Sequence, residues 1–256
     1  MTSPTLKDIL RSSDPSYGIW VASGNAVNAE ICASAGFDWL VIDTEHAPND
    51  LRSVVAQLQA AYGYPVAPVV RPAVADTVLF KQYLDAGVTG FLVPMIDSVE
   101  AAEAVVRAVR YPPRGVRGVG AGLARSSRWG LDAQYVHHAD DGIGVIVQVE
   151  HIDAIPHVAA IAAVDGVDSV YLGPADLAAS MGLLGQSAHP DVVATVEAAI
   201  RTIAATGKAA GVNTFDPTLA RRYVQAGARL VTVTADVALL ANGARQAAAS
   251  FRATQS

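Results

Sequence analysis

Several residue types are scarce in this sequence of 256 residues, and each scarcity excludes a class of protein. The single cysteine, Cys32, can form neither an internal disulfide nor a zinc cluster, and it points to a reducing cytoplasm. Charged residues make up only 16% of the chain and hydrophobic residues 52%, which excludes general disorder. No apolar run reaches about 18 residues, and the start, MTSPTLKDIL, lacks the pattern of a signal peptide. We therefore expect no membrane association.

Positive charge is also in short supply. Lysine and arginine together number 18 against 24 acidic residues, which gives a formal net charge of −6. A negative chain of this kind is not suited to nucleic acid or to an anionic membrane surface. We therefore expect neither nucleic acid nor a membrane among its partners.

The sequence that remains alternates short runs rich in Val and Ile with longer Ala-rich stretches of helical spacing. We predict strands at 17–23, 39–46, 67–73, 90–96, 144–152, 169–174, 208–215 and 230–236. We predict helices near 25–35, 50–62, 76–86, 98–110, 153–163, 190–206, 217–226 and 237–251. Continuously apolar strands that alternate with helices indicate a parallel sheet covered by helices. Eight such units favour a single-domain α/β protein, a (β/α)8 barrel of the TIM type spanning 1–256, over an open sheet.

One segment, 111–142, interrupts this alternation. It contains four arginines and Trp129 and has no clear strand. We expect it on the carboxyl face of the barrel, because it comes after the fourth strand. It is either an irregular surface excursion or a functional element, a lid or a subunit contact.

Polar residues gather where four of the predicted strands end. In a barrel, the carboxyl ends of the strands form the active site. Strands two, three, five and six end in polar residues, and these include His46, Arg71, Gln148, Glu150 and Asp176. The sequence therefore predicts one site at this end of the barrel.

Glu150 and Asp176 are candidate metal ligands. Two carboxylates without a paired His or Cys suit a hard ion such as Mg²⁺ or Mn²⁺. Gln148 and Glu150 lie two residues apart on a strand, so both side chains point into the barrel. The alternative is a pair of surface carboxylates near loops.

The segment 173–177, GPADL, reads as a strand that turns into a helix, with Pro174 at the first helical position. The free amides of Ala175 and Asp176 then face the site and can hold a carboxylate, although ordinary helix capping explains the same sequence. Arg71 supplies a fixed cation for an enolate oxygen, or else a salt bridge that closes the barrel. His46 lies beside carboxylates that hold one tautomer of its ring.

Lysine positions separate two kinds of carbon–carbon bond chemistry. A Schiff-base enzyme needs a buried lysine near the carboxyl end of a strand. The chain has only Lys7, Lys81 and Lys208, and none of them is predicted at such a position. Covalent imine chemistry is therefore disfavoured.

Several motifs occur in a familiar order and spacing: WLVIDTEHAPND, VVRP, YPPRGVRGVG with LARSSRW, VQVE and YLGPADLAASMG. With them the chain resembles the metal-dependent 2-oxo acid aldolases of the HpcH/HpaI aldolase/citrate lyase family. This family includes 4-hydroxy-2-oxoheptanedioate aldolases and 2-keto-3-deoxy sugar-acid aldolases. The resemblance covers nearly the whole chain.

The resemblance implies a modified (β/α)8 barrel that assembles as a hexamer with helix exchange between paired subunits. It implies reversible cleavage of a 4-hydroxy-2-oxo acid into pyruvate, or hydroxypyruvate, and an aldehyde. Its implied metal ligands are Glu150 and Asp176, for Mg²⁺, Mn²⁺ or Co²⁺. The implied carboxylate clamp is Gln148 with the amides of Ala175 and Asp176. The implied catalytic residues are His46 as the base, acting through a water on the metal, Asp85 as its helper and Arg71 as the group that stabilises the enolate.

Two other functions remain open from the sequence. A barrel lyase acting on a CoA thioester shares the same metal-enolate chemistry, but it needs a nucleotide pocket. A barrel without catalysis, used as a binding module, does not need the polar strand ends. The natural aldehyde is not specified by these residues.

Overall fold

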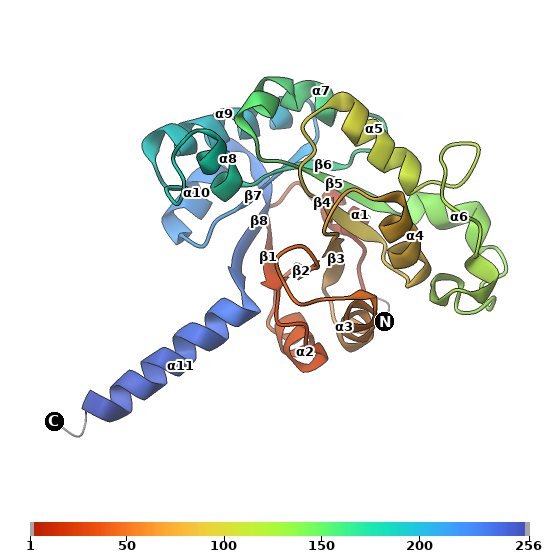
Figure 1. Cartoon of the computed structure of the whole chain (residues 1–256), viewed down its shortest axis with the longest axis horizontal. Coiled ribbons are helices and arrows are strands. Elements are labelled where there is room, and N and C mark those ends of the chain that lie inside the picture. Colours follow the sequence, from red (N-terminus) through yellow and green to blue (C-terminus); the bar gives the residue numbers. More distant parts are fainter. Residues whose placement is uncertain (1–2, 254–256) are drawn as a thin grey trace.

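Eight parallel strands close into a barrel in the order β1 to β8, each hydrogen-bonded to its sequence neighbour and β8 to β1 (Figure 1). The computed structural model describes residues 3–253. The strands are β1 Ser16–Val21, β2 Trp39–Asp43, β3 Ala67–Arg71, β4 Gly90–Val93, β5 Gly144–Val149, β6 Ser169–Leu172, β7 Ala209–Asn213 and β8 Ala228–Ala235. Most of their residues are buried, as expected for strands covered on both faces. The predicted TIM-type barrel is confirmed.

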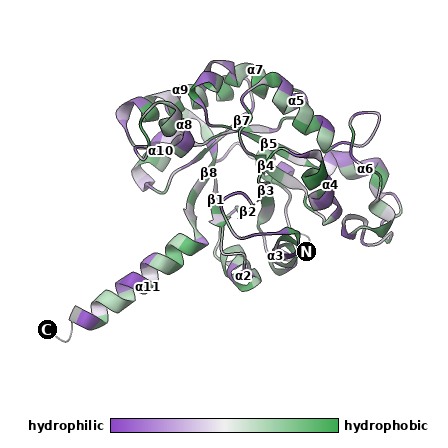
Figure 2. Ribbon diagram, in the orientation of Figure 1, coloured by the Kyte–Doolittle hydropathy of each residue, from purple (hydrophilic) through white to green (hydrophobic). Residues whose placement is uncertain are grey.

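Helices surround the barrel and follow the strands along the chain (Figure 1). They are α1 Leu6–Arg11, α2 Ala26–Ser34, α3 Leu51–Ala61, α4 Thr77–Asp85, α5 Val99–Ala108, α6 Tyr135–Gly142, α7 Val158–Ala162, α8 Pro174–Ser180, α9 Pro190–Ala205, α10 Pro217–Ala226 and α11 Asp236–Ala253. Short 3₁₀ turns lie at Ala121–Leu123, Arg125–Ser127 and Ile152–His157. Apolar side chains concentrate on the strands and on the helix faces that cover them (Figure 2).

Two large rings fill part of the barrel interior. Trp39 and Tyr171 are both fully buried and meet edge to face, with 6.3 Å between their ring centroids. Each ring lies against a glycine of a neighbouring strand, Trp39 against Gly18 and Tyr171 against Gly211. A Cβ atom at either glycine would collide with the ring, so a side chain at these positions is incompatible with this packing.

Helix α1 closes the amino end of the barrel. Its Leu6 is fully buried and lies against Gly90 and Gly144, the first residues of β4 and β5. The carboxyl ends of the strands remain the open end of the barrel.

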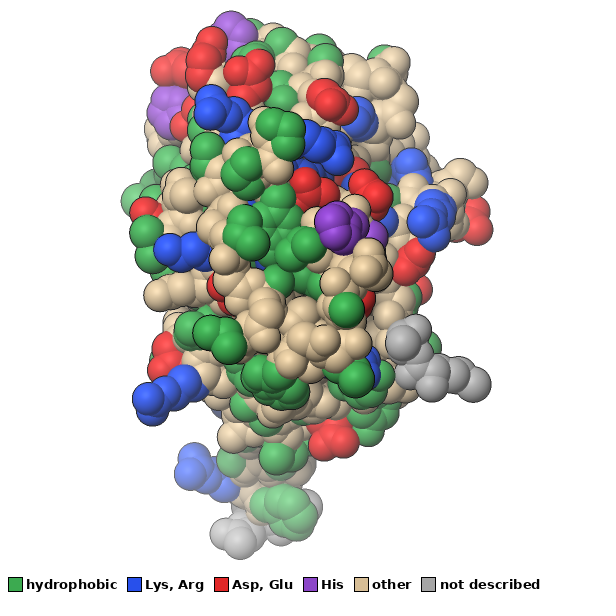
Figure 3. Space-filling view, turned by 90° about the vertical axis from the view of Figure 1, so that its right-hand side faces the viewer, with side chains coloured by type: hydrophobic (Ala, Val, Ile, Leu, Met, Phe, Trp, Pro, Cys, Tyr) green, Lys and Arg blue, Asp and Glu red, His purple; other side chains and the backbone are tan. Residues whose placement is uncertain are grey.

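The arginine-rich segment lies at the amino end of the barrel, which corrects the expectation that it lies on the carboxyl face. It follows helix α5, which returns the chain from the carboxyl end, and it leads into the start of β5. Its Arg125 donates a hydrogen bond from Nη1 to the backbone oxygen of Ala86, 2.8 Å away, at the end of α4. The face that carries α4 and α6 shows apolar side chains gathered beside basic ones (Figure 3).

Helix α11 extends away from the barrel (Figure 1). Its first residue, Asp236, is buried, and its carboxylate accepts hydrogen bonds from the amides of Ala22 and Ser23 at the end of β1. Beyond this anchor, Leu239 and Leu240 are exposed by 53% and 65%. Within residues 3–253, no helix has the length and hydropathy needed to cross a bilayer.

Candidate active site

A cavity of about 300 Å³ lies at the carboxyl ends of the strands. It is lined by Trp20, Ala22, Asp43, His46, Arg71, Gln148, Gly173, Pro174, Ala175, Asp176, Asn213 and Ala235. The structure thus brings His46, Arg71, Gln148 and Asp176 to one cavity, at the end of the barrel where the sequence placed them. The cavity is of a size suited to a small ligand.

Arg71 is held rigidly in the wall of this cavity. Its Nε and Nη2 donate two parallel hydrogen bonds to the carboxylate of Asp43, at 2.8 and 2.7 Å, and Nη1 lies 3.0 Å from Glu45 Oε2. The guanidinium also stacks over the ring of Trp20, 4.2 Å from its centroid. Although desolvation opposes a buried charge, the hydrogen bonds to Asp43 raise the pKa of Arg71. A fixed, fully ionised cation therefore faces the cavity.

Glu150 is buried behind Gln148 at the end of β5. Its Oε1 accepts a hydrogen bond from the amide of Met95 at 2.9 Å, and its Oε2 accepts one from Gln148 Nε2 at 2.5 Å. Met95 adopts a left-handed backbone with φ of 56°, which is strained for a side chain of this size. Gly173 makes room for this carboxylate, because a Cβ there would collide with Glu150 Oε2 and lie 3.0 Å from Gln148 Nε2.

The Glu150 carboxylate forms no ion pair with a lysine, arginine or histidine among residues 3–253. Burial raises the pKa of Glu150 to about 7, the Met95 amide opposes the rise, and the nearby Asp176 adds to it. Asp176 forms no ion pair among these residues either. The buried Oε1 of Gln148 also has no hydrogen-bond partner. This donor set fits a divalent cation that prefers oxygen.

Such a metal site would have few ligands from the protein. Within residues 3–253, no group of three or more His, Cys, Asp or Glu side chains is placed to hold a metal ion. Glu150 and Asp176 would therefore leave several coordination positions to water and to substrate oxygens.

His46 lies at the open side of the cavity. Its side chain is 68% exposed, and its Nε2 is 3.9 Å from Glu45 Oε2. Desolvation raises the pKa of Glu45 against the pull of Arg71. The imidazole is therefore next to an acidic group while remaining accessible to a ligand.

Ala175 and Asp176 begin helix α8, and Pro174 is its first residue as predicted. Both line the cavity together with Gln148. The structure thus brings the three predicted clamp residues together, and their role in holding a carboxylate stays a prediction.

Asp85 is the predicted site residue that one chain does not bring to the cavity. It is the last residue of α4, at the amino end of the barrel, and its Oδ1 lies 3.6 Å from Arg117 Nη2. Since His46 lies at the opposite end, Asp85 can act as its helper only from another copy of the chain.

Sequence reasoning missed three contributors to the site. Trp20 stacks on Arg71 and donates a hydrogen bond from Nε1 to Asn213 Oδ1 at 3.0 Å. Met95, which holds Glu150 through its amide, lies two residues after the end of β4, where the sequence showed no polar residue. The polar residue at the end of β7, Asn213, could have been recognised in the sequence as a site residue. The strained backbone at Met95 could not.

Comparison with known proteins identifies the family of this chain. The model of the HpcH/HpaI aldolase/citrate lyase family matches residues 16–243. The chain belongs to this family. This confirms the resemblance found in the motifs, and members of the HpcH/HpaI family generally depend on a divalent metal ion.

Similar proteins of this family come from several bacteria. A hydroxypyruvate/pyruvate aldolase of Pseudomonas aeruginosa is 52% identical over 246 residues, which cover 96% of this chain and 92% of the relative. A 4-hydroxy-2-oxo-heptane-1,7-dioate aldolase of Salmonella dublin is 48% identical over 247 residues, covering 96% and 94%. The crystal structure of an HpcH/HpaI family protein from Burkholderia cenocepacia J2315 matches with a TM-score of 0.91 and 41% identity, covering 96% and 98%. The predicted class of carbon–carbon lyase is confirmed.

Proposed function

We propose that this chain is a metal-dependent aldolase that reversibly cleaves 4-hydroxy-2-oxo acids into pyruvate or hydroxypyruvate and an aldehyde. The observation that carries the proposal is a rigid cation that lies at the same strand ends as two carboxylates, neither of which forms an ion pair within residues 3–253. Arg71 supplies the cation, and Glu150 with Asp176 supplies the carboxylates. The names of the relatives supply the substrate class.

Lysine placement supports a metal mechanism over an imine mechanism. Lys7 Nζ lies 3.9 Å from Asp168, and Lys208 Nζ donates a hydrogen bond to the backbone oxygen of Val167 at the amino end of the barrel. Lys81 lies on α4, outside the barrel, next to Gly118. None of these three lysines lines the cavity, so none of them offers its amine for a Schiff base with the 2-oxo group.

Glu150 and Asp176 would hold a divalent ion, and that ion would supply Lewis acidity toward the 2-oxo acid. Around it, Gln148 and the amides of Ala175 and Asp176 orient the substrate carboxylate. Arg71 places its charge where the oxyanion of the enolate develops, and because Asp43 and Trp20 already hold it, no reorganisation is needed during the reaction. His46 moves the proton at the exposed side of the cavity. We propose Mg²⁺, Mn²⁺ or Co²⁺ as the ion.

The test of this function is metal-dependent aldol cleavage. We expect chelation to abolish cleavage of a 4-hydroxy-2-oxo acid and Mg²⁺, Mn²⁺ or Co²⁺ to restore it. Borohydride added with pyruvate should leave the enzyme active, with Lys208→Arg as a matched control. A borohydride-trapped lysine adduct, or full activity after chelation, contradicts the proposal.

The same assay separates the two alternatives. Cleavage of malyl-CoA or citryl-CoA, without turnover of free 2-oxo acids, would identify a CoA-dependent lyase. Absence of proton exchange at the methyl group of pyruvate would identify a barrel used only for binding. The polar cluster around Arg71 and Glu150 argues against this second alternative.

We propose further that the enzyme is a homo-oligomer, a hexamer in which α11 is exchanged between paired copies. The support is the shape of the single chain: α11 extends from the barrel with Leu239 and Leu240 exposed. An apolar helix face needs a surface to cover it. Assembly is also the only means by which Asp85 can reach a His46.

The reducing compartment and the single domain also remain proposals. A lone, buried Cys32 supports a cytoplasmic enzyme. The closed barrel and its surrounding helices support one domain for the chain.

A further inference from the structure

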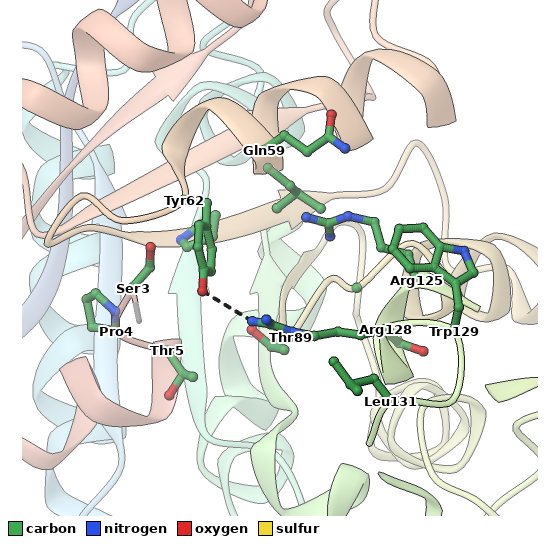
Figure 4. Close-up of a pocket in the computed structure, with 14 residues that line it drawn as sticks. Ser3, Pro4, Thr5, Gln59, Tyr62, Thr89, Arg125, Arg128, Trp129 and Leu131 are labelled. Atoms are coloured by element: carbon green, nitrogen blue, oxygen red, sulfur yellow. Dashed lines mark hydrogen bonds between the residues drawn. The ribbon is translucent and has the colours of Figure 1, made fainter. Parts of the chain in front are cut away.

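A second cavity, of about 640 Å³, lies at the amino end of the barrel, opposite the candidate active site (Figure 4). Its walls come from the segment before α1, from the end of α3 and from the arginine-rich segment. Cavities of this size commonly hold small organic ligands. It is about twice as large as the catalytic cavity.

Two arginines share this cavity without an acidic residue. Arg125 and Arg128 line it, and no Asp or Glu does. Within residues 3–253, neither arginine forms an ion pair. Burial lowers the pKa of Arg125, and the nearby charge of Arg128 lowers it further. Two neighbouring cations in a partly desolvated space are relieved by a bound anion.

Aromatic rings lie beside these cations. Arg128 donates a hydrogen bond from Nη2 to Tyr62 Oη at 3.2 Å, and its guanidinium lies 5.8 Å from the centre of the Tyr62 ring. Trp129 lines the same cavity and remains 69% exposed. Figure 4 shows both arginine side chains pointing into the space between Tyr62 and Trp129.

The backbone fixes this arrangement. Arg128 and Trp129 both adopt left-handed conformations, with φ of 54° and 55°, before Gly130 at 85°. Consecutive left-handed residues other than glycine are strained and persist only where the surroundings hold them. The strained pair presents a cation and an aromatic ring to the same cavity.

We propose that this cavity binds an aromatic ligand that carries one anionic group, a carboxylate or a phosphate. The guanidinium of Arg128 pairs with the anionic group, and the rings of Tyr62 and Trp129 pack against the aromatic body. Within one chain, the polar strand ends of the catalytic cavity lie at the other end of the barrel, so the residues that line this second cavity bind the ligand without converting it. Gly87, two residues after Asp85, lines the second cavity.

Isothermal titration calorimetry with 2-naphthoate and 2-naphthyl phosphate tests the proposal. The enzyme is kept saturated with Mg²⁺ and pyruvate, so that the catalytic cavity is occupied. We expect one binding event per chain, and the affinities of the two probes decide between carboxylate and phosphate. Arg128→Gln should weaken both by roughly tenfold or more, and the neutral 2-naphthol should bind more weakly by a similar factor. Arg114→Gln, which removes an arginine that is 64% exposed elsewhere on the same segment, should leave binding unchanged.

Three outcomes would overturn the proposal: no binding of either anion, equal binding of 2-naphthol, or unchanged binding in Arg128→Gln. A fall in assembly mass of Arg128→Gln in light scattering, without binding in the wild type, would assign the cavity to a contact between copies. Circular dichroism of each variant checks that it is folded. Because the readout is binding and not turnover, its failure leaves the aldolase proposal intact, and failure of aldol cleavage leaves this site intact.

Discussion

Arg71 illustrates how one side chain in this barrel serves both structure and chemistry. Its Nε and Nη2 donate hydrogen bonds to the buried Asp43, and its Nη1 lies next to Glu45. The plane of its guanidinium stacks on the ring of Trp20. Removing Arg71 leaves the buried Asp43 carboxylate without its counter-ion, which typically costs about 3–5 kcal/mol of stability. Any loss of activity at this position must therefore be separated from a loss of folding.

We expect Arg71→Lys to keep the fold better than Arg71→Ala and to restore only part of the activity, because lysine lacks the planar fork. Arg71→Ala should lower turnover by about 10²–10³-fold and weaken pyruvate binding. Proton exchange at the pyruvate methyl group, followed by NMR in deuterated water, measures the first effect, and calorimetry the second. Thermal unfolding of each variant supplies the folding control. Wild-type exchange in both variants would mean that Arg71 is structural.

His46 should behave differently, because its side chain is exposed and lies 3.9 Å from Glu45 without a close hydrogen bond to it. His46→Ala should slow methyl-proton exchange by about 10²–10⁴-fold while pyruvate affinity and thermal stability stay near wild type. His157→Ala, on the turn before α7, is the matched control. A His46→Ala variant that loses pyruvate binding would instead place His46 among the substrate ligands.

Among the elements, α11 allows the most direct test of the proposed assembly. Leu240 is exposed in one chain, so a charge there harms the protein only if another copy covers it. We expect Leu240→Glu to reduce the mass measured by light scattering, while Gln246→Glu, which adds the same charge on the exposed part of the same helix, leaves it unchanged. A wild type that is monomeric at micromolar concentration would refute the proposed hexamer.

The sequence predicted the elements best where pattern and packing agree. Every Val- and Ile-rich run became a strand, but the prediction for 39–46 continued past Asp43, where β2 ends. The residues after it are polar and leave the sheet to build the site, so hydrophobicity alone does not mark the end. Helices α1 and α6 were missed because one is six residues long and the other, YVHHADDG, is polar.

Predicting the site was limited in a similar way. Strand-end logic placed Arg71 and Glu150 correctly, because parallel strands bring their carboxyl ends together whatever the loops do. It could not find Met95, whose contribution is a backbone amide. It also placed the arginine-rich segment at the wrong end of the barrel, because the helix that precedes it, α5, returns the chain to the amino end.

For the whole molecule, Glu150 links stability to pH. Burial raises its pKa to about 7 in the folded chain, whereas glutamate in an unfolded chain titrates near about 4.3. Between these values the folded state keeps a proton that the unfolded state has lost, so the free energy of unfolding falls as pH rises. In metal-free protein we expect Glu150 to contribute a loss on the order of 3 kcal/mol across this window.

Urea unfolding in the presence of a chelator, from about pH 5 to about pH 8, measures this effect. Glu150→Gln is the matched control, since it keeps the shape and removes the titration. The free energy of unfolding of the wild type should fall relative to that of the variant as pH rises. Excess Mg²⁺ should reverse this trend, because a metal binds the ionised carboxylate. A difference that stays constant with pH would show that Glu150 is ionised throughout.

The two glycine–ring contacts inside the barrel constrain how the family can diverge. Trp39 fills the space that a side chain at position 18 would occupy, and Tyr171 does the same for position 211. Neither partner can change size alone without a collision or a void. Positions 18 and 39, and likewise 211 and 171, should therefore covary among relatives, with a larger residue at the glycine accompanied by a smaller one at the ring. Such covariation would reflect the packing of the barrel interior and would be independent of the catalytic residues.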